Sequence, residues 1–296
     1  MLQGMNILIM GGDARFLIVM DDLIGNGANV HVIGYDQFTV QQPNIHSHSL
    51  DTMDFSKIDA IVLPVSGTNA QGKMEAMYSE EEIYINAEIL NQTPKHCIIY
   101  SGTTNDFLTQ LAEENQRKLV TLFARDDLAI YNSIPTAEGT LKIAIDETDT
   151  TIHGAKILVL GFGRVGFTVA RLFKNVGAHV HVAARKSTDI ARITELGLQP
   201  IRLNEVDQQI QDMDICINTI PHLILNKELL DQVSKETLII DITSAPGGTD
   251  FAYAEKVGIK TVHGLGLPGK TAPKTAGKVI GRIINELLEE QYKKQS

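Results

Sequence analysis

A strand–turn–helix–strand pattern that occurs twice, 150 residues apart, constrains the fold of this chain most strongly. Residues 7–36 align with residues 157–186 without a gap, and nine of these positions are identical. The glycine after the first apolar run recurs (Gly11 and Gly161), as does the glycine before the second run (Gly27 and Gly177). Duplication and convergence would both produce this pattern. In either case, each half of the chain is predicted to open a doubly wound α/β unit.

Short continuous apolar runs alternate with helical segments along the rest of the chain, which is typical of parallel strands covered by helices on both faces. The predicted strands are 6–10, 30–34, 60–65, 98–101, 156–160, 180–184, 215–219, 238–242 and 260–263. We therefore predict an α/β fold with two Rossmann-like domains, each a doubly wound parallel sheet. A length of 296 residues suits two domains, which we expect at 1–132 and 133–274. The amphipathic C-terminal helix, 275–296, is expected to return to the first domain.

The second copy of the pattern carries a dinucleotide-binding fingerprint, G-x-G-x-x-G, between a strand and a helix. Gly161 would form the tight turn, Gly163 would let the backbone approach a pyrophosphate, and Gly166 would allow close helix–strand packing. The first copy has Asp13 and Phe16 at the positions of Gly163 and Gly166. A carboxylate would repel the pyrophosphate there. We therefore expect the second domain to bind the cofactor and the first to bind the substrate.

The end of the second strand in the cofactor domain predicts which nicotinamide cofactor is bound. An NAD enzyme places Asp or Glu about twenty residues after the first fingerprint glycine. This chain instead has Arg185, Lys186 and Ser187, which suit the 2′-phosphate of NADP, with NAD or a solvated basic loop as the alternatives. The predicted cofactor-binding residues are Gly161, Phe162, Gly163, Arg164, Val165, Gly166, Arg185, Lys186, Ser187, Thr219, Ile220, Pro221 and Ser244.

The charge balance argues against whole classes of partner. Lys plus Arg is 26 and Asp plus Glu is 36, so the formal net charge is −10. This charge disfavours nucleic acid and anionic membrane surfaces. No apolar run approaches the roughly 20 residues of a membrane span, and the N-terminus has no signal-peptide pattern. Cys97 and Cys216 lie in apolar runs without metal-ligand spacing. We therefore expect a cytoplasmic protein without a metal site.

Several longer strings resemble the A-subunit family of bacterial dipicolinate synthase. They are GGDAR (11–15), LPVS (63–66), IYNSIPT (130–136) with Glu138-Gly139, INTIP (217–221), PGGTD (246–250), GLPG (266–269) and APKTAG (272–277). The resemblance covers essentially the whole chain. It implies the last step of dipicolinate formation during sporulation, in which dihydrodipicolinate is oxidised to the aromatic pyridine dicarboxylate with a nicotinamide cofactor. It also implies that a flavoprotein-like B subunit is the partner.

A small dicarboxylate substrate accords with the cationic and hydroxyl-bearing residues that follow the predicted strands and the join between domains. The predicted substrate-binding residues are Arg15, Ser66, Ser101, Asn132, Ser133, Lys270 and Lys274. The proton acceptor is left open among Glu138, Asp13 and His222, in falling order. Residues 131–139 and 264–275, which carry several of these side chains, are expected to form irregular loops.

Two other functions remain open at this point, and so does self-association into a homo-oligomer. One is a different NADP-dependent dehydrogenase of a small acid, of the shikimate type, for which Lys73 is a loose match to a catalytic lysine. The other is a subunit that senses the nucleotide without catalysis.

Overall fold

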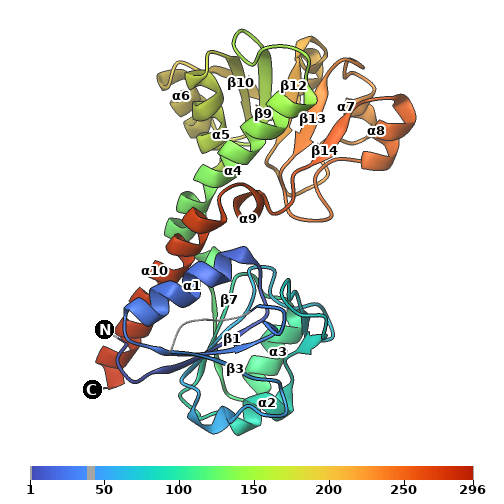
Figure 1. Cartoon of the computed structure of the whole chain (residues 1–296). Coiled ribbons are helices and arrows are strands. Elements are labelled where there is room, and N and C mark those ends of the chain that lie inside the picture. Colours follow the sequence, from blue (N-terminus) through green and yellow to red (C-terminus); the bar gives the residue numbers. More distant parts are fainter. Residues whose placement is uncertain (1, 39–43, 296) are drawn as a thin grey trace. The chain divides into compact units, whose positions relative to one another are not determined.

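The computed structural model describes residues 2–38 and 44–295, which form two compact units. Unit 1 is Met1–Ala129 together with Pro273–Ser296, and unit 2 is Ile130–Ala272. Figure 1 shows a central sheet with helices packed against it in each unit. In the part of the chain that the structure describes, no helix is long and apolar enough to cross a membrane.

Unit 1 contains a six-stranded sheet in the order β3-β2-β1-β4-β7-β8, in which all the pairings are parallel. Its strands are β1 (Asn6–Met10), β2 (Asn29–Ile33), β3 (Ile45–Ser47), β4 (Ala60–Val62), β7 (Ile98–Ser101) and β8 (Lys118–Thr121). A separate antiparallel pair is formed by β5 (Lys73–Met74) and β6 (Ile83–Tyr84). The helices are α1 (Ala14–Gly25), α2 (Ala87–Gln92), α3 (Asp106–Glu114) and α10 (Pro273–Gln295), with 3₁₀ turns at Phe55–Lys57 and Leu122–Ala124.

Alternate residues of each strand in unit 1 enter two cores, one on each face of the sheet. Ile7 and Ile9 pack in the core that contains α1 and α10, whereas Leu8 and Met10 pack in the core that contains α2 and α3. The apolar stripe of α10 is buried in the first of these cores through Ile280, Ile283, Ile284 and Leu288. The prediction that the C-terminal helix returns to the first domain is therefore confirmed.

A glycine allows α10 to lie close against α1. A Cβ atom at Gly277 would collide with the backbone carbonyl oxygen of Arg15, near the start of α1. One turn further along, a Cβ atom at Gly281 would lie 3.0 Å from the Cβ atom of Asp22. Small residues in α10 therefore set the distance between the two helices, next to the loop that follows β1.

Unit 2 repeats the same topology, with the strand order β11-β10-β9-β12-β13-β14 and parallel pairings throughout. Its strands are β9 (Lys156–Leu160), β10 (His179–Ala184), β11 (Gln199–Arg202), β12 (Ile215–Asn218), β13 (Leu238–Asp241) and β14 (Thr261–His263). The helices are α4 (Asp126–Glu147, which begins in unit 1), α5 (Arg164–Asn175), α6 (Ser187–Glu195), α7 (Lys227–Leu230), α8 (Phe251–Val257) and α9 (Leu267–Thr271), with 3₁₀ turns at Leu203–Gln208 and Ile210–Asp212.

The two sheets confirm the predicted pair of doubly wound folds. In each, the strand order reverses direction beside the first strand, between β1 and β4 in unit 1 and between β9 and β12 in unit 2. Open α/β sheets bind ligands at the carboxyl ends of the strands at such a switch point. Each unit therefore has one edge where a ligand site is expected.

Two segments predicted as irregular loops contain helices instead. Residues 131–139 lie inside α4, although Pro135 is part of this helix. The helix persists because Ala137 and Ala144 are buried in the core of unit 2. The segment 264–275 contains all of α9 and the start of α10. A Cβ atom at Gly139 would lie 2.6 Å from the Thr271 hydroxyl, so this glycine allows α9 to pack closely on α4.

Candidate active site

The fingerprint glycines of unit 2 take the positions that dinucleotide binding requires. Gly161 has φ +97°, and a Cβ atom there would lie 2.6 Å from the Thr219 hydroxyl oxygen. A Cβ atom at Gly166 would collide with the carbonyl oxygen of Gly161, so only glycine lets α5 approach β9 this closely. Gly163 caps α5 without any side-chain hydrogen bond, and nothing lies within 4 Å of the position of its Cβ atom. The N-terminus of α5 is therefore open to an anionic group.

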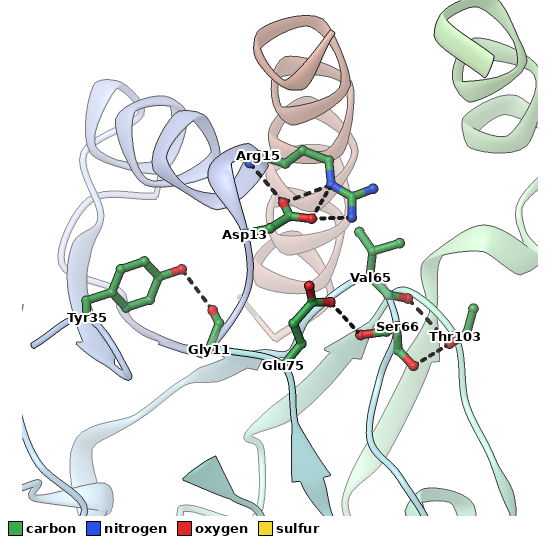
Figure 2. A network of polar contacts seen from close by, with 8 residues as sticks. All are labelled: Gly11, Asp13, Arg15, Tyr35, Val65, Ser66, Glu75 and Thr103. Carbon is green, nitrogen blue, oxygen red and sulfur yellow. Dashed lines mark hydrogen bonds and ion pairs between the residues drawn. The ribbon is translucent and has the colours of Figure 1, made fainter. Parts of the chain in front are cut away.

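Unit 1 closes the corresponding helix N-terminus with its own side chains (Figure 2). The Asp13 carboxylate caps α1 by accepting from the Arg15 backbone N–H at 3.0 Å. The same carboxylate accepts from the Arg15 guanidinium, with Nε at 2.9 and 3.0 Å from the two oxygens and one terminal nitrogen at 2.5 Å. Phe16, at the position of Gly166, would lie only 2.6 Å from a Cβ atom at Gly12. The carboxylate occupies the place that a phosphate takes at an open helix N-terminus.

The connection between β5 and β6 covers the same loop of unit 1. The Glu75 carbonyl oxygen accepts from the Gly12 N–H at 2.7 Å, and the Met77 N–H donates to the Gly12 carbonyl at 2.9 Å. Gly11 has φ +62°, and a Cβ atom there would collide with the Glu75 carbonyl oxygen. Together with the Asp13 cap, this covering segment leaves no room for a pyrophosphate at the first fingerprint-like turn.

The three residues predicted to select NADP lie where β10 ends and α6 begins. Lys186 is the N-cap of α6, with no side-chain cap hydrogen bond, and Ser187 is the first helical residue. Arg185, Lys186 and Ser187 are all exposed. Two cationic side chains and the N–H groups of a helix N-terminus are thus available to one anionic group.

The loops that follow β12 and β13 in unit 2 are joined by a buried carboxylate. Asp241 is fully buried and accepts five hydrogen bonds. The donors are the N–H and hydroxyl of Thr243 (3.0 and 2.6 Å), the Asn218 amide (3.0 Å), the Gly248 N–H (2.8 Å) and the Thr249 hydroxyl (2.7 Å). Burial by itself would raise the pKa of Asp241, but the hydrogen bonds from these side chains outweigh it and hold the pKa below its ordinary value.

The other predicted cofactor residues surround this network and the fingerprint turn. Thr219 donates through its hydroxyl to the Leu160 carbonyl at 2.8 Å, and the Ile220 N–H donates to the Asn218 side-chain oxygen at 3.0 Å. Pro221 and Ser244 are exposed in the two loops that Asp241 joins. Phe162 and Val165 pack partly against the core, and Arg164 begins α5.

Three predicted substrate residues of unit 1 belong to loops at the carboxyl ends of neighbouring strands. Arg15 is buried and paired with Asp13, and Ser66 is exposed after β4, with its hydroxyl 3.3 Å from a Glu75 carboxylate oxygen. Figure 2 shows these side chains around one opening. Ser101 is fully buried and donates to the Thr103 carbonyl at 2.6 Å, so its hydroxyl supports the loop from within. Lys274 is exposed near the start of α10.

The remaining predicted site residues lie in unit 2 and are not gathered by any hydrogen bond between them that the structure shows among the described residues. Ser133 is fully buried in α4, where its hydroxyl lies 2.7 Å from the Thr168 hydroxyl. Asn132 is half-buried in the same helix, and its carbonyl accepts from the Thr136 hydroxyl at 2.8 Å. The exposed residues of this set are Glu138 on α4, His222 after β12 and Lys270 on α9.

Two functional candidates were missed by sequence reasoning. Asp241 was recognisable in principle, because it is the single acid at the end of an otherwise apolar strand, Leu238–Asp241. Glu75 gave no such signal, since it lies in a polar connection whose pairing with Gly12 is visible only in three dimensions. Lys73, the loose match to a shikimate-type lysine, forms an ion pair with Glu82 at 2.5 Å. Among the described residues, no group of three or more His, Cys, Asp or Glu side chains could hold a metal ion.

Comparison with known proteins identifies both halves of the chain. A model of the N-terminal domain of the dipicolinate synthase A subunit matches residues 6–123. A model of the D-isomer specific 2-hydroxyacid dehydrogenase NAD binding domain matches residues 131–246. The dipicolinate synthase A subunit of Bacillus subtilis (strain 168) is 48% identical over 274 residues, which are 93% of this chain and 92% of the relative.

Solved structures agree with these matches. The crystal structure of the dipicolinate synthase A subunit from Bacillus halodurans superimposes with a TM-score of 0.95 at 46% identity, covering 97% of this chain and 99% of the other. The crystal structure of the same subunit from Bacillus subtilis gives 0.93 at 47% identity, covering 99% of each chain. A transhydrogenase from Sinorhizobium meliloti shares the fold alone, with a TM-score of 0.66 at 15% identity over 96% of this chain and 94% of that one.

Proposed function

This chain belongs to the family of dipicolinate synthase A subunits, and on that basis we propose that it oxidises dihydrodipicolinate to dipicolinate with NADP during sporulation. It is an NAD(P)-dependent oxidoreductase with a Rossmann domain for a nicotinamide dinucleotide. In the proposed reaction the dihydropyridine ring loses a hydride to C4 of the nicotinamide and a proton to a base. The products are the aromatic pyridine dicarboxylate and the reduced cofactor.

One observation carries the proposal, namely the contrast between the two equivalent helix N-termini. The N-terminus of α5 carries no side-chain cap, whereas the N-terminus of α1 is capped by the Asp13 carboxylate. The two ends follow equivalent strands of equivalent sheets. The difference supports binding of the dinucleotide pyrophosphate by α5 in unit 2, through backbone N–H groups and the helix dipole.

The residues at the start of α6 support NADP as the cofactor. Arg185 and Lys186 are exposed beside an uncapped helix N-terminus, and no acidic residue stands at the end of β10 to accept from the ribose hydroxyls. One charge-assisted hydrogen bond contributes about 1.5–3 kcal/mol. Two of them to a 2′-phosphate would correspond to a preference for NADP over NAD of about a hundredfold or more.

The substrate is a small dianion, and unit 1 contributes Arg15 and Ser66 to its binding. Arg15 uses Nε and one terminal nitrogen to hold Asp13. This pairing orients the guanidinium and leaves its second terminal nitrogen for a substrate carboxylate. Lys270, Lys274 and Asn132 supply further polar contacts. Asp13 acts as a positioning residue, because both of its oxygens are engaged by Arg15.

The proposed setting is the cytoplasm, where the chain works with a B subunit. The name of the Bacillus subtilis relative, which calls it one lettered subunit of a synthase, implies such a multi-subunit enzyme. No contact with a partner is assigned to any surface of this chain.

The proposal is tested by mixing the purified chain with its candidate B subunit, dihydrodipicolinate and either NADP or NAD. The absorbance of the reduced cofactor and the formation of dipicolinate are followed together. We expect the two products in equal amounts, with NADP preferred. Reduction of cofactor with a different small hydroxy acid, but not with dihydrodipicolinate, would support the shikimate-type alternative and overturn the proposal.

Cofactor choice is tested with the double variant Arg185→Ala/Lys186→Ala. We expect its Kd for NADP to rise about a hundredfold while its Kd for NAD changes little. The matched control is Lys235→Ala/Lys256→Ala, which removes the same charge from exposed positions of unit 2. Equal weakening in both double variants would refute the assignment of the 2′-phosphate site.

A further inference from the structure

A cavity of about 400 Å³ lies beside the switch point of unit 1, where β4 ends. It is lined by Ser66, Gly67, Thr68, Asn69, Lys73, Met74 and Glu75. The cavity is thus formed by the loop after β4 on one side and by the segment that covers the Gly11-Gly12 turn on the other. Figure 2 shows two of its side chains, Ser66 and Glu75, next to the Asp13–Arg15 pair.

The backbone of Glu75 is held rigidly at this place. Its carbonyl oxygen accepts from the Gly12 N–H, and the isolated bridge between Gly12 and Ala76 continues the pairing. Any side chain at Gly11 would displace the Glu75 carbonyl. Antiparallel pairing of Met74 with Ile83 holds the segment from its other end. A carboxylate carried on such a support can be presented to a ligand with little loss of conformational entropy.

The polar groups of this cavity are incompletely satisfied. The Thr68 hydroxyl oxygen is buried and has no hydrogen-bond partner among the described residues. Glu75 is exposed and accepts only from the Ser66 hydroxyl, at a long 3.3 Å, among the side-chain contacts of the described part of the chain. A buried hydroxyl without a partner is costly. A polar ligand that pairs with Thr68 and Ser66 would remove that cost.

The charged groups around Glu75 are arranged so that its carboxylate is not neutralised. The Arg15 guanidinium is paired with Asp13 on α1, and the Lys73 ammonium is paired with Glu82 on the β5–β6 hairpin. Within the described residues, Glu75 has no ion pair with Lys or Arg. It differs in this respect from Asp13, whose two oxygens are both held by a cation and which is therefore a poor proton acceptor.

We propose that Glu75 is the proton acceptor of the reaction and that Ser66 and Thr68 bind a substrate carboxylate in this cavity. The inference rests on the proposed oxidation of dihydrodipicolinate and adds the base that this reaction needs. One ring C–H bond breaks with transfer of its electron pair, as hydride, to C4 of NADP. A ring proton passes to a Glu75 carboxylate oxygen, and the electrons of that bond complete the aromatic ring. Glu75 then releases the proton to solvent.

The test compares Glu75→Gln with wild type in the reconstituted reaction, in which the chain and its B subunit are both present. A general base contributes typically 10²–10⁴-fold to a rate. We therefore expect kcat to fall by about a hundredfold or more, with the Kd for NADP unchanged. The acidic limb of the pH profile of kcat should disappear in the variant, and Glu75→Asp should restore part of the activity.

The matched control is Glu81→Gln, which changes an exposed glutamate between β5 and β6 to the same amide. We expect this variant to retain wild-type kcat and the wild-type pH profile. Ser66→Ala is expected to raise KM severalfold while leaving the acidic limb in place. Circular dichroism and NADP binding verify that each variant is folded.

Two outcomes separate failure of this inference from failure of the proposed function. If wild type oxidises dihydrodipicolinate and Glu75→Gln does so with an unchanged kcat and pH profile, Glu75 is not the base, although the function stands. If wild type does not oxidise dihydrodipicolinate in any combination, the proposed function fails, and the inference fails with it.

Discussion

Replacing Asp241 with Asn should destabilise unit 2 and weaken cofactor binding together. The substitution preserves size but places an amide NH₂ group where a carboxylate oxygen accepted hydrogen bonds. One oxygen of Asp241 accepts from the Thr243 N–H and hydroxyl, and the other accepts from Asn218, Gly248 and Thr249. Whichever way the amide turns, it faces at least one backbone N–H, of Thr243 or of Gly248, that cannot reverse its role.

The structure permits an estimate of the loss. The favourable orientation sacrifices the bond from the Thr243 N–H, while the Thr243 hydroxyl can rotate and accept. Hydrogen bonds to a charged group contribute about 1.5–3 kcal/mol each, and a buried donor left without a partner costs about 1–3 kcal/mol. We expect a total loss of about 2–4 kcal/mol, a large part of the 5–15 kcal/mol that typically stabilises a domain.

Urea unfolding followed by far-ultraviolet circular dichroism measures this loss, since the chain contains no Trp. Because the protein has two units, the transition is first tested for a second step. NADP titration of the same variant should show a raised Kd, because the loops after β12 and β13 are no longer joined. The control is Asp207→Asn, at an exposed position of unit 2. If Asp241→Asn unfolds within 0.5 kcal/mol of that control, a value typical of surface substitutions, the network does not have the role assigned to it.

Two further predictions concern unit 1. Burial, and then the nearby His48 and His46, lower the pKa of His31 to about 4 from 6.5. Its neutral form stabilises the fold fully above pH 6.5, and this stability is lost as the pH falls toward 4. In urea unfolding between these pH values, His31→Gln should lose less stability than wild type, and parallel curves would contradict the assignment. Gly277→Ala should lower the melting temperature, because the added Cβ atom meets the Arg15 carbonyl oxygen and overpacking costs about 1–3 kcal/mol. The control Gly25→Ala has open space around it and should leave the protein as stable or slightly more stable.

The central strands of both sheets could be predicted from the sequence because their burial leaves a continuous apolar signal. The predicted strands 6–10, 98–101 and 156–160 coincide with β1, β7 and β9. The edge strands β3 and β11 and the partly exposed β8 were missed, since short strands with polar, solvent-facing side chains have no such pattern. Pro135 suggested a loop, whereas burial of Ala137 and Ala144 sustains a helix through it.

The candidate site could be predicted only where local backbone geometry determines it. The fingerprint turn needs glycine at Gly161 and Gly166 for reasons that hold within a few residues, and those reasons can be inferred from spacing. The hydroxyl of Ser101 could not be placed in this way, because its partner is the carbonyl of Thr103 in a loop whose path depends on its neighbours. Glu75 reaches its position through a backbone pairing with a turn more than sixty residues earlier in the chain, and no local pattern encodes such a pairing.

The central claim is that the second Rossmann unit binds the nicotinamide cofactor and that its twin does not. It is tested most directly by titrating NADPH into the purified chain and into Gly163→Asp, which places in unit 2 the residue that closes the matching helix of unit 1. The account predicts one site per chain in wild type and none in the variant, with circular dichroism unchanged. Two sites in wild type, or one undiminished site in Gly163→Asp, would contradict it.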